Sequence, residues 1–301
     1  MLGEADGKLI PATFERCREI LRACIRLKRL FLFLMILAAA LVSSSVFAAD
    51  NSAQIPTNVF SIAATAGRSL SLYNYQDGTE KGSWDYSANP SYELSKTLSL
   101  SGLFEYSYDT VAETGDYGRG LISLTQSGYQ LFGDHLNVSL IGTVGLPISK
   151  STYESSLQAS TSAGIKASVN NSYFVTKKLD MSFAVKGTKN FHAYETNSVG
   201  QVNTSLIFTE SSSLSWSFND RLQVIIEVYH FNTVSYFGTY RDFLSHNEEL
   251  DIKFSPQITF ALGHSWGLPY VSTLKANGQD FNFNLADAQN SIVYAQIGVT
   301  Y

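Results

Sequence analysis

Most of the chain alternates between apolar and polar residues. From Leu98 to Tyr108, leucine and aromatic residues take all but one of the even positions, while serine and glutamate take most of the odd ones. The same period of two recurs at 136–146, 179–185 and 222–228. Because successive side chains of a strand point to opposite faces, this period predicts strands with one apolar and one polar face. Beyond residue 48 we find no amphipathic stripe of helical period, so we predict an all-β fold.

The spacing of the turns predicts how these strands are arranged. Short polar breaks at 95–96, 133–134, 176–178, 219–220 and 255–257 alternate with longer polar stretches at 77–83, 110–117, 148–158, 193–199, 237–246 and 266–289. Between them we expect twelve strands, near 65–76, 84–94, 97–109, 118–131, 136–147, 159–175, 179–191, 200–218, 222–235, 246–254, 257–265 and 290–301. An even number of strands, with short turns at one end and long loops at the other, is typical of an antiparallel transmembrane β-barrel.

A water-soluble β-sandwich is the alternative all-β fold, because it also shows alternation. Three features favour the barrel. Many strands are as long as a tilted membrane strand, and aromatic residues such as Trp216 and Phe218 gather at strand ends. The polar faces consist of Ser, Thr, Asn and Gly rather than Lys and Glu.

The N-terminal part of the chain is typical of an exported precursor. The thirteen residues Leu30–Val42 are apolar, basic residues precede them, and Val46-Phe47-Ala48 supplies small residues for a peptidase. Thirteen helical residues cover only ~20 Å, less than a bilayer core, although an extension through the following serines would make an uncleaved anchor. We therefore expect a signal peptide at 27–48 with cleavage after Ala48. Residues 1–26 are an over-long gene start or an extended n-region, 49–64 a short periplasmic segment, and 65–301 the barrel.

Composition narrows the classes of partner. The formal net charge of the whole chain is −5, and removal of the basic presequence makes it more negative. We therefore expect no nucleic acid as a partner, because no basic stripe exists to neutralise phosphates. Both cysteines, Cys17 and Cys24, lie in the presequence, which excludes disulfides and thiolate metal sites from the mature chain.

The C-terminus carries a family resemblance. Apolar residues alternate with Tyr, Gln, Gly and Thr up to an aromatic last residue; these positions are Val293, Ala295, Ile297, Val299 and Tyr301. The pattern resembles the terminal strand of Gram-negative outer-membrane β-barrel proteins, in which it serves as an assembly signal and usually ends in Phe. The resemblance implies a location in the bacterial outer membrane, contact with its lipid, and a barrel assembly machinery as partner during biogenesis. It does not identify a subfamily.

One motif suggests hydrolase chemistry. Gly263-His264-Ser265-Trp266-Gly267 matches G-x-S-x-G, which in hydrolases lifts a nucleophilic serine onto a turn between a strand and a helix. No helix pattern follows, so we interpret the segment as the rim of a barrel strand.

Barrel enzymes such as the outer-membrane phospholipase and the lipid A deacylases resemble one another in carrying His-x-Ser on one strand. None of the five histidines here has serine two residues later, and His264 and Ser265 are adjacent, hence on opposite faces of a strand. We expect no enzyme, no cofactor and no metal site, since the histidines are scattered and Glu248-Glu249 is expected at a loop edge.

The polar face of each strand is the candidate functional surface. If Leu98, Leu136 and Leu179 face lipid, charged residues of the opposite parity face the lumen. These pore candidates are Glu105, Lys166, Lys186, Glu227, Asp251 and Lys253. Charges within a membrane protein line water or pair with one another, so they form either a solute-selecting constriction or salt bridges that fill a narrow barrel.

The function that these observations favour is a channel for small polar solutes. In size and layout alone, the chain resembles twelve-stranded specific porins for oligosaccharides and nucleosides. The alternatives are a structural or adhesive barrel with a filled lumen, and a barrel lipid hydrolase.

Overall fold

The computed structural model describes residues 60–72, 82–132, 135–171, 174, 178–269, 285–287 and 290–301. All of them belong to one compact unit of the chain, which spans Gln54–Tyr301. The expected signal peptide and the segment before it lie outside the described residues. Among the described residues, no helix is both long and apolar enough to cross a membrane.

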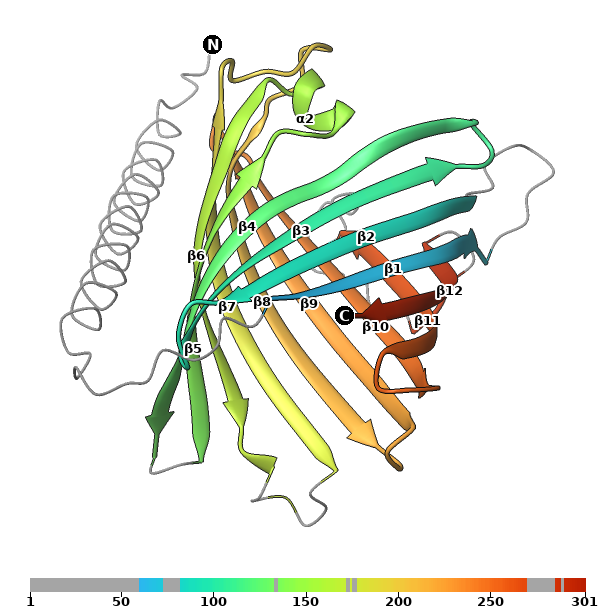
Figure 1. Cartoon of the computed structure of the whole chain (residues 1–301). Coiled ribbons are helices and arrows are strands. Elements are labelled where there is room, and N and C mark those ends of the chain that lie inside the picture. The colour runs from blue at the N-terminus through green and yellow to red at the C-terminus, as the bar shows by residue number, and fades with distance from the viewer. Residues whose placement is uncertain are drawn as a thin grey trace, which may run out of the picture. The chain divides into compact units, whose positions relative to one another are not determined.

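Twelve antiparallel strands close into a barrel, each paired with its neighbours in sequence (Figure 1). They are β1 (Phe60–Ser71), β2 (Gly82–Glu93), β3 (Leu98–Asp109), β4 (Thr114–Leu131), β5 (Leu136–Leu146), β6 (Leu157–Val169), β7 (Leu179–His192), β8 (Thr204–Ser217), β9 (Leu222–Ser235), β10 (Tyr240–Lys253), β11 (Ile258–Pro269) and β12 (Ser291–Thr300). The expected fold, an all-β antiparallel barrel of about twelve strands, is therefore confirmed.

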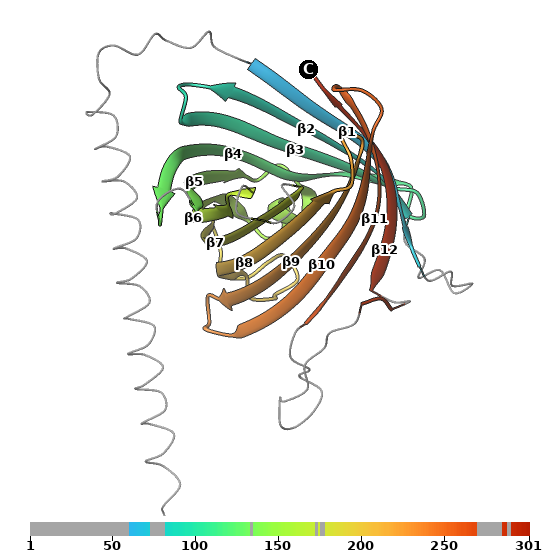
Figure 2. The same cartoon turned by 90° about the horizontal axis from the view of Figure 1, so that it is seen from below.

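The first and last strands close the ring. β1 pairs with β12 from Ala63↔Thr300 to Ser71↔Ile292. Beyond the ladder, the backbone N–H of Ile62 donates to the Tyr301 carbonyl at 3.0 Å, and the Tyr301 N–H donates back at 2.9 Å. Figure 2 shows the strands as a ring with β1 beside β12. Closure satisfies the backbone groups that an open sheet edge would leave unpaired in lipid.

The outer face of the barrel is apolar. Large side chains that are exposed to more than a third of their area include Tyr86, Ile165, Val185, Leu262 and Ile297. The register places each of them opposite residues of the same face on the adjacent strands, as in Ile165↔Val185. A continuous exposed apolar band on a closed barrel is the surface that a bilayer covers.

The connections differ in part from the expected strict alternation of short and long. Two connections at the long-loop end, 110–113 and 236–239, are as short as turns, because β4 begins at Thr114 and β10 at Tyr240. The polarity of the residues after these connections predicts loops. Strand ends that project beyond the lipid nevertheless remain paired, whatever the polarity of their side chains. At the other end, 170–178 is longer than the expected turn.

The observed boundaries of other strands differ by a few residues from those that the sequence predicts. β1 begins at Phe60 rather than 65, so residues 60–64, expected in a periplasmic segment, belong to the barrel. β11 extends to Pro269 and includes the whole Gly263–Gly267 motif, which is strand rather than nucleophile turn. Glu248 and Glu249 lie within β10 and not at a loop edge.

The one helix among the described residues is α2 (Lys150–Glu154), in the connection between β5 and β6. Ser149 caps it, because its hydroxyl accepts a hydrogen bond from the Thr152 N–H at 3.2 Å. Such a cap satisfies one of the N–H groups that a helix start leaves without a partner.

Candidate functional site in the barrel lumen

The face opposite the apolar band lines the lumen. Contacts between distant strands support this assignment: Arg119 on β4 lies within electrostatic range of Lys186 on β7 and of Tyr229 on β9. Strands that are separated by several others in the ring meet in this way only across the interior of the barrel. Residues that alternate in step with these inward residues, along each strand and across the register, also face the lumen.

A bidentate ion pair joins β3 and β4 within the lumen. Glu105 accepts hydrogen bonds from the Arg119 Nε at 2.8 Å and from its second guanidinium nitrogen, and also from the Arg119 backbone N–H at 3.1 Å. The β3–β4 register shifts between Phe104 and Tyr106, and this irregularity brings Arg119 beside Glu105. Gly118 allows the approach, since a Cβ there would lie 2.9 Å from the Glu105 Cβ. The planar fork geometry fixes both side chains.

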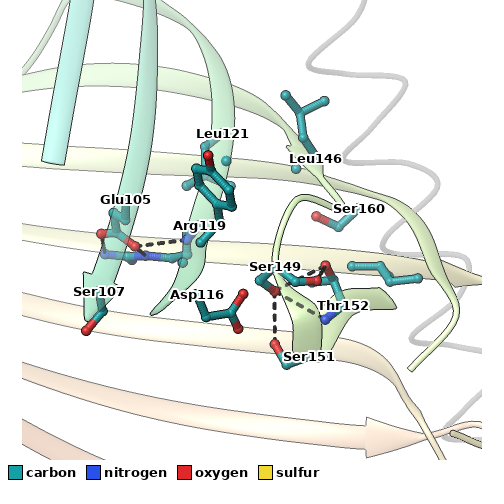
Figure 3. Close-up of a pocket in the computed structure, with 15 residues that line it drawn as sticks. Glu105, Ser107, Asp116, Arg119, Leu121, Leu146, Ser149, Ser151, Thr152 and Ser160 are labelled. Carbon is teal, nitrogen blue, oxygen red and sulfur yellow. Dashed lines mark hydrogen bonds and ion pairs between the residues drawn. The ribbon is translucent and has the colours of Figure 1, made fainter. Parts of the chain in front are cut away.

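The pair lies beside a pocket at the end of the barrel that carries α2 (Figure 3). The pocket has a volume of about 490 Å³ and is lined by residues from β3, β4, β5, β6 and the α2 connection. Its lining includes Asp116, Ser149 and Ser160, and the Asp116 carboxylate accepts the Lys150 N–H at 2.8 Å. Polar groups and one ion pair therefore line part of this pocket, beside apolar residues such as Leu121 and Leu146.

Basic residues gather on one wall of the lumen. Lys166 on β6 lies opposite Ser139 and Ala184 in the register, and Lys186 on β7 lies opposite Gly164 and Thr209. Together with Arg119 on β4, these two lysines form what we call the basic wall. The register neighbours of the two lysines are small or hydroxylic, whereas Arg119 is held by Glu105.

Acidic residues form a second wall on β9 and β10, which we define as Glu227, Glu249 and Asp251. The Tyr229 hydroxyl donates to Glu227 at 2.9 Å. Glu249 accepts hydrogen bonds from the Tyr294 hydroxyl at 2.7 Å and from the Gln296 amide at 3.0 Å. These donors stabilise the carboxylates, and the charge of Glu249 lies within range of those of Glu227 and Asp251.

A further carboxylate, Asp85 on β2, is held by serine hydroxyls. Ser69, Ser83 and Ser107 all donate to it, at distances of 2.5 to 3.0 Å. The charge of Asp85 also acts on Glu105 on the adjacent strand.

The structure places all six pore candidates from the sequence on the inner face. Lys253 lies at the end of β10, where it acts on Asp251. Val293, Ala295, Ile297 and Val299 lie on the outer face of β12, and Tyr301 follows that strand. Two functional roles remain predictions: solute selection by the six pore candidates, and an assembly signal formed by the residues of β12 and Tyr301.

Sequence reasoning missed Arg119, Glu249, Asp85, Tyr229 and Tyr294. Alternation could have identified Asp85 and Tyr229, which lie between outward residues of their strands. Arg119 was not accessible in this way, because the register shift in β4 interrupts the alternation. As the sequence indicated, His264 and Ser265 lie on opposite faces: His264 pairs with Glu248 on the outer face and Ser265 with Asn247 on the inner face.

Comparisons with known proteins agree on the fold. No protein-family model matches the chain, and no curated protein does. Among solved structures, the NanC porin is similar with a TM-score of 0.50 at 12% identity over 80% of this chain and 98% of that one. An outer-membrane channel from Pseudomonas putida F1 is similar with a TM-score of 0.54 at 7% identity, covering 84% and 99%. The chain therefore has the fold of outer-membrane β-barrel channels.

Proposed function

We propose that this protein is an outer-membrane channel that passes small polar solutes through its lumen. The observation that carries the proposal is that Lys166 and Lys186 of the basic wall face no carboxylate in the register, while carboxylates gather on β9 and β10. Lumen charges that served packing alone would all pair with opposite charges, as Glu105 and Arg119 do. Lysines that face no carboxylate in the register instead leave charge that acts on polar solutes in the lumen.

The magnitude of this effect is sufficient for selectivity. A unit charge several ångströms from a permeant ion contributes on the order of 1 kcal/mol in a water-filled lumen, which biases the choice of ion several-fold. Twelve strands lie between the eight of a packed barrel and the sixteen of a wide porin, so a narrow opening is the expected result.

The outer face supports a location in the outer membrane. Its exposed aromatic and aliphatic side chains occupy alternate positions along the strands, apart from the changes of parity at the register shifts of β4, as a barrel exterior in lipid requires. The resemblance of the last strand to the assembly signal of outer-membrane proteins supports the same compartment.

Planar-bilayer recordings test the proposal. Lys166→Glu combined with Lys186→Glu should shift the reversal potential in a salt gradient towards cations, because it removes most of the positive charge from the basic wall. The matched control is Lys96→Glu with Lys150→Glu, which makes the same charge change at exposed sites outside the strands. Salt screens such sites over ~10 Å, so the control should shift the potential much less.

Two results would contradict the channel. The first is a folded barrel that never conducts, and the second is a control pair that shifts selectivity as much as the lumen pair. Either would favour the alternative of a structural barrel whose lumen charges serve packing.

A further inference from the structure

Ionisable side chains interrupt the apolar outer face on β10 and β11, apart from a second such group formed by Glu210, His230 and Asp242. His246 and Glu248 are two residues apart on β10 and therefore point to the same face. The register places His264 of β11 directly opposite Glu248. The other neighbours of these residues on that face are apolar: Ile226 opposite Glu248, Val228 opposite His246, and Val293 opposite His264. Ionisable residues on a surface that lipid covers are costly, so they indicate a function.

The three side chains converge on a common centre. Glu248 contacts the Nδ1 of His246 through one carboxylate oxygen at 2.6 Å and the Nδ1 of His264 through the other at 2.7 Å. One ligand atom from each residue lies within 4.8 Å of those of the other two. Two imidazoles and one carboxylate thus share a space of the size that a single ion occupies.

The surroundings hold these groups in place. The His246 side chain is only 3% exposed, and the Trp266 ring stacks on it with centroids 5.2 Å apart. The Trp266 indole N–H donates in turn to Asp287. The Nε2 of His264 is buried and has no hydrogen-bond partner among the described residues. A buried imidazole nitrogen with its lone pair uncommitted is a potential metal ligand.

We propose that His246, Glu248 and His264 form a binding site for a divalent transition-metal ion of the zinc class on the outer face of the barrel. Two imidazole nitrogens and one carboxylate are the ligand set of many three-residue zinc sites, which leave a fourth position for water or another ligand. Imidazole favours zinc, nickel and copper over calcium and magnesium, which prefer sites built from oxygen alone. A bound ion would also link β10 to β11.

Binding follows from small changes in the present geometry. The Nδ1 of each imidazole must present a lone pair to the ion in place of its contact with Glu248, and protons compete with the ion for that lone pair, so binding weakens at low pH. The register of the β10–β11 hairpin already holds the three ligands on one face, which lowers the entropic cost of ordering them.

Zinc binding to the protein purified from membranes without a polyhistidine tag tests the site. Equilibrium dialysis should find one tightly bound Zn²⁺ per chain that excess Ca²⁺ does not displace. Glu248→Gln and His264→Gln should each raise the zinc dissociation constant at least about 100-fold, since even outer-shell changes weaken metal sites by 10–100-fold. The matched control is Glu210→Gln, because Glu210 contacts His230 at 3.2 Å on the same outer face. That variant should bind zinc like the parent.

A second measurement keeps the test decisive if a ligand variant fails to assemble. The Co²⁺-loaded parent protein should show the strong visible absorption of a four-coordinate site with nitrogen ligands. The proposal is overturned if the parent binds no zinc, or if Glu248→Gln binds as tightly as the parent. It is also overturned if Glu210→Gln loses zinc equally, or if Co²⁺ shows only the weak spectrum of a six-coordinate ion.

Discussion

At the residue scale, glycines decide where lumen side chains can lie. Tyr294 of β12 reaches the acidic wall on β10 by crossing β11 at Gly263, and its hydroxyl donates to Asn247 at 2.9 Å as well as to Glu249. A Cβ at Gly263 would overlap the Tyr294 ring. Gly263, the first glycine of the G-x-S-x-G match, therefore makes room for the Tyr294 ring and does not shape a nucleophile turn.

Substitution at Gly263 tests this role. Gly263→Ala should lower the free energy of unfolding by about 1–3 kcal/mol, the usual cost of overpacking, because the Tyr294 ring must move. Gly142→Ala is the control, since a Cβ at Gly142 meets nothing within 4 Å, and it should change stability by less than about 0.5 kcal/mol. Urea unfolding in lipid vesicles, followed by tryptophan fluorescence, measures both. Equal stability of the two variants would refute the packing argument.

At the scale of the element, alternation assigns each strand residue to lipid or to the lumen, except where a bulge intervenes. β4 shows both cases. From Gly120 to Gln126 it alternates in step with β3, whereas the register shifts at both ends of that segment. These shifts add residues to one strand only, so every residue beyond them changes its parity relative to the partner strand.

Arginine substitutions at two adjacent positions of β4 test whether the alternation separates residues that face lipid from residues that face the lumen. Ile122 faces outward and is 41% exposed, while Ser123 faces the lumen between Ser101 and Thr143. Ile122→Arg should cost roughly 2–4 kcal/mol of unfolding free energy in a bilayer, and Ser123→Arg much less, because only the first charge enters lipid. The folded fraction during urea titration in vesicles provides the measurement. If both substitutions cost the same, the outer face of β4 does not contact a bilayer.

At the scale of the whole molecule, closure of the barrel creates the candidate site. In the ring, β8 alone separates β7 of the basic wall from β9 of the acidic wall, and closure directs the side chains of both walls into one lumen. An even number of strands also places the start of β1 and the end of β12 at the same end, together with the turns 94–97, 218–221 and 254–257.

This arrangement predicts which end faces the outside of the cell. Cysteine at Tyr153, an 84% exposed residue of α2, should react with a membrane-impermeant thiol reagent on intact cells. Cysteine at Asp220, in the turn between β8 and β9, should react only after the cells are opened. The parent chain serves as the control, because it shows any labelling of the native cysteines Cys17 and Cys24. Labelling of Asp220→Cys alone on intact cells would invert the topology.

The sequence by itself determined the all-β class, the twelve strands and the inward parity of the six pore candidates, because a period of two is a local property that each strand carries in its own residues. Strand ends at Thr114 and Tyr240 were missed, since polar residues at a barrel rim form strand or loop equally well until pairing decides. Tertiary structure alone decided the Glu105–Arg119 pair, which depends on a register shift, and the convergence of His246, Glu248 and His264, which depends on the register of two strands. Contacts between strands follow from which residues are placed opposite each other, and a single sequence does not record that alignment.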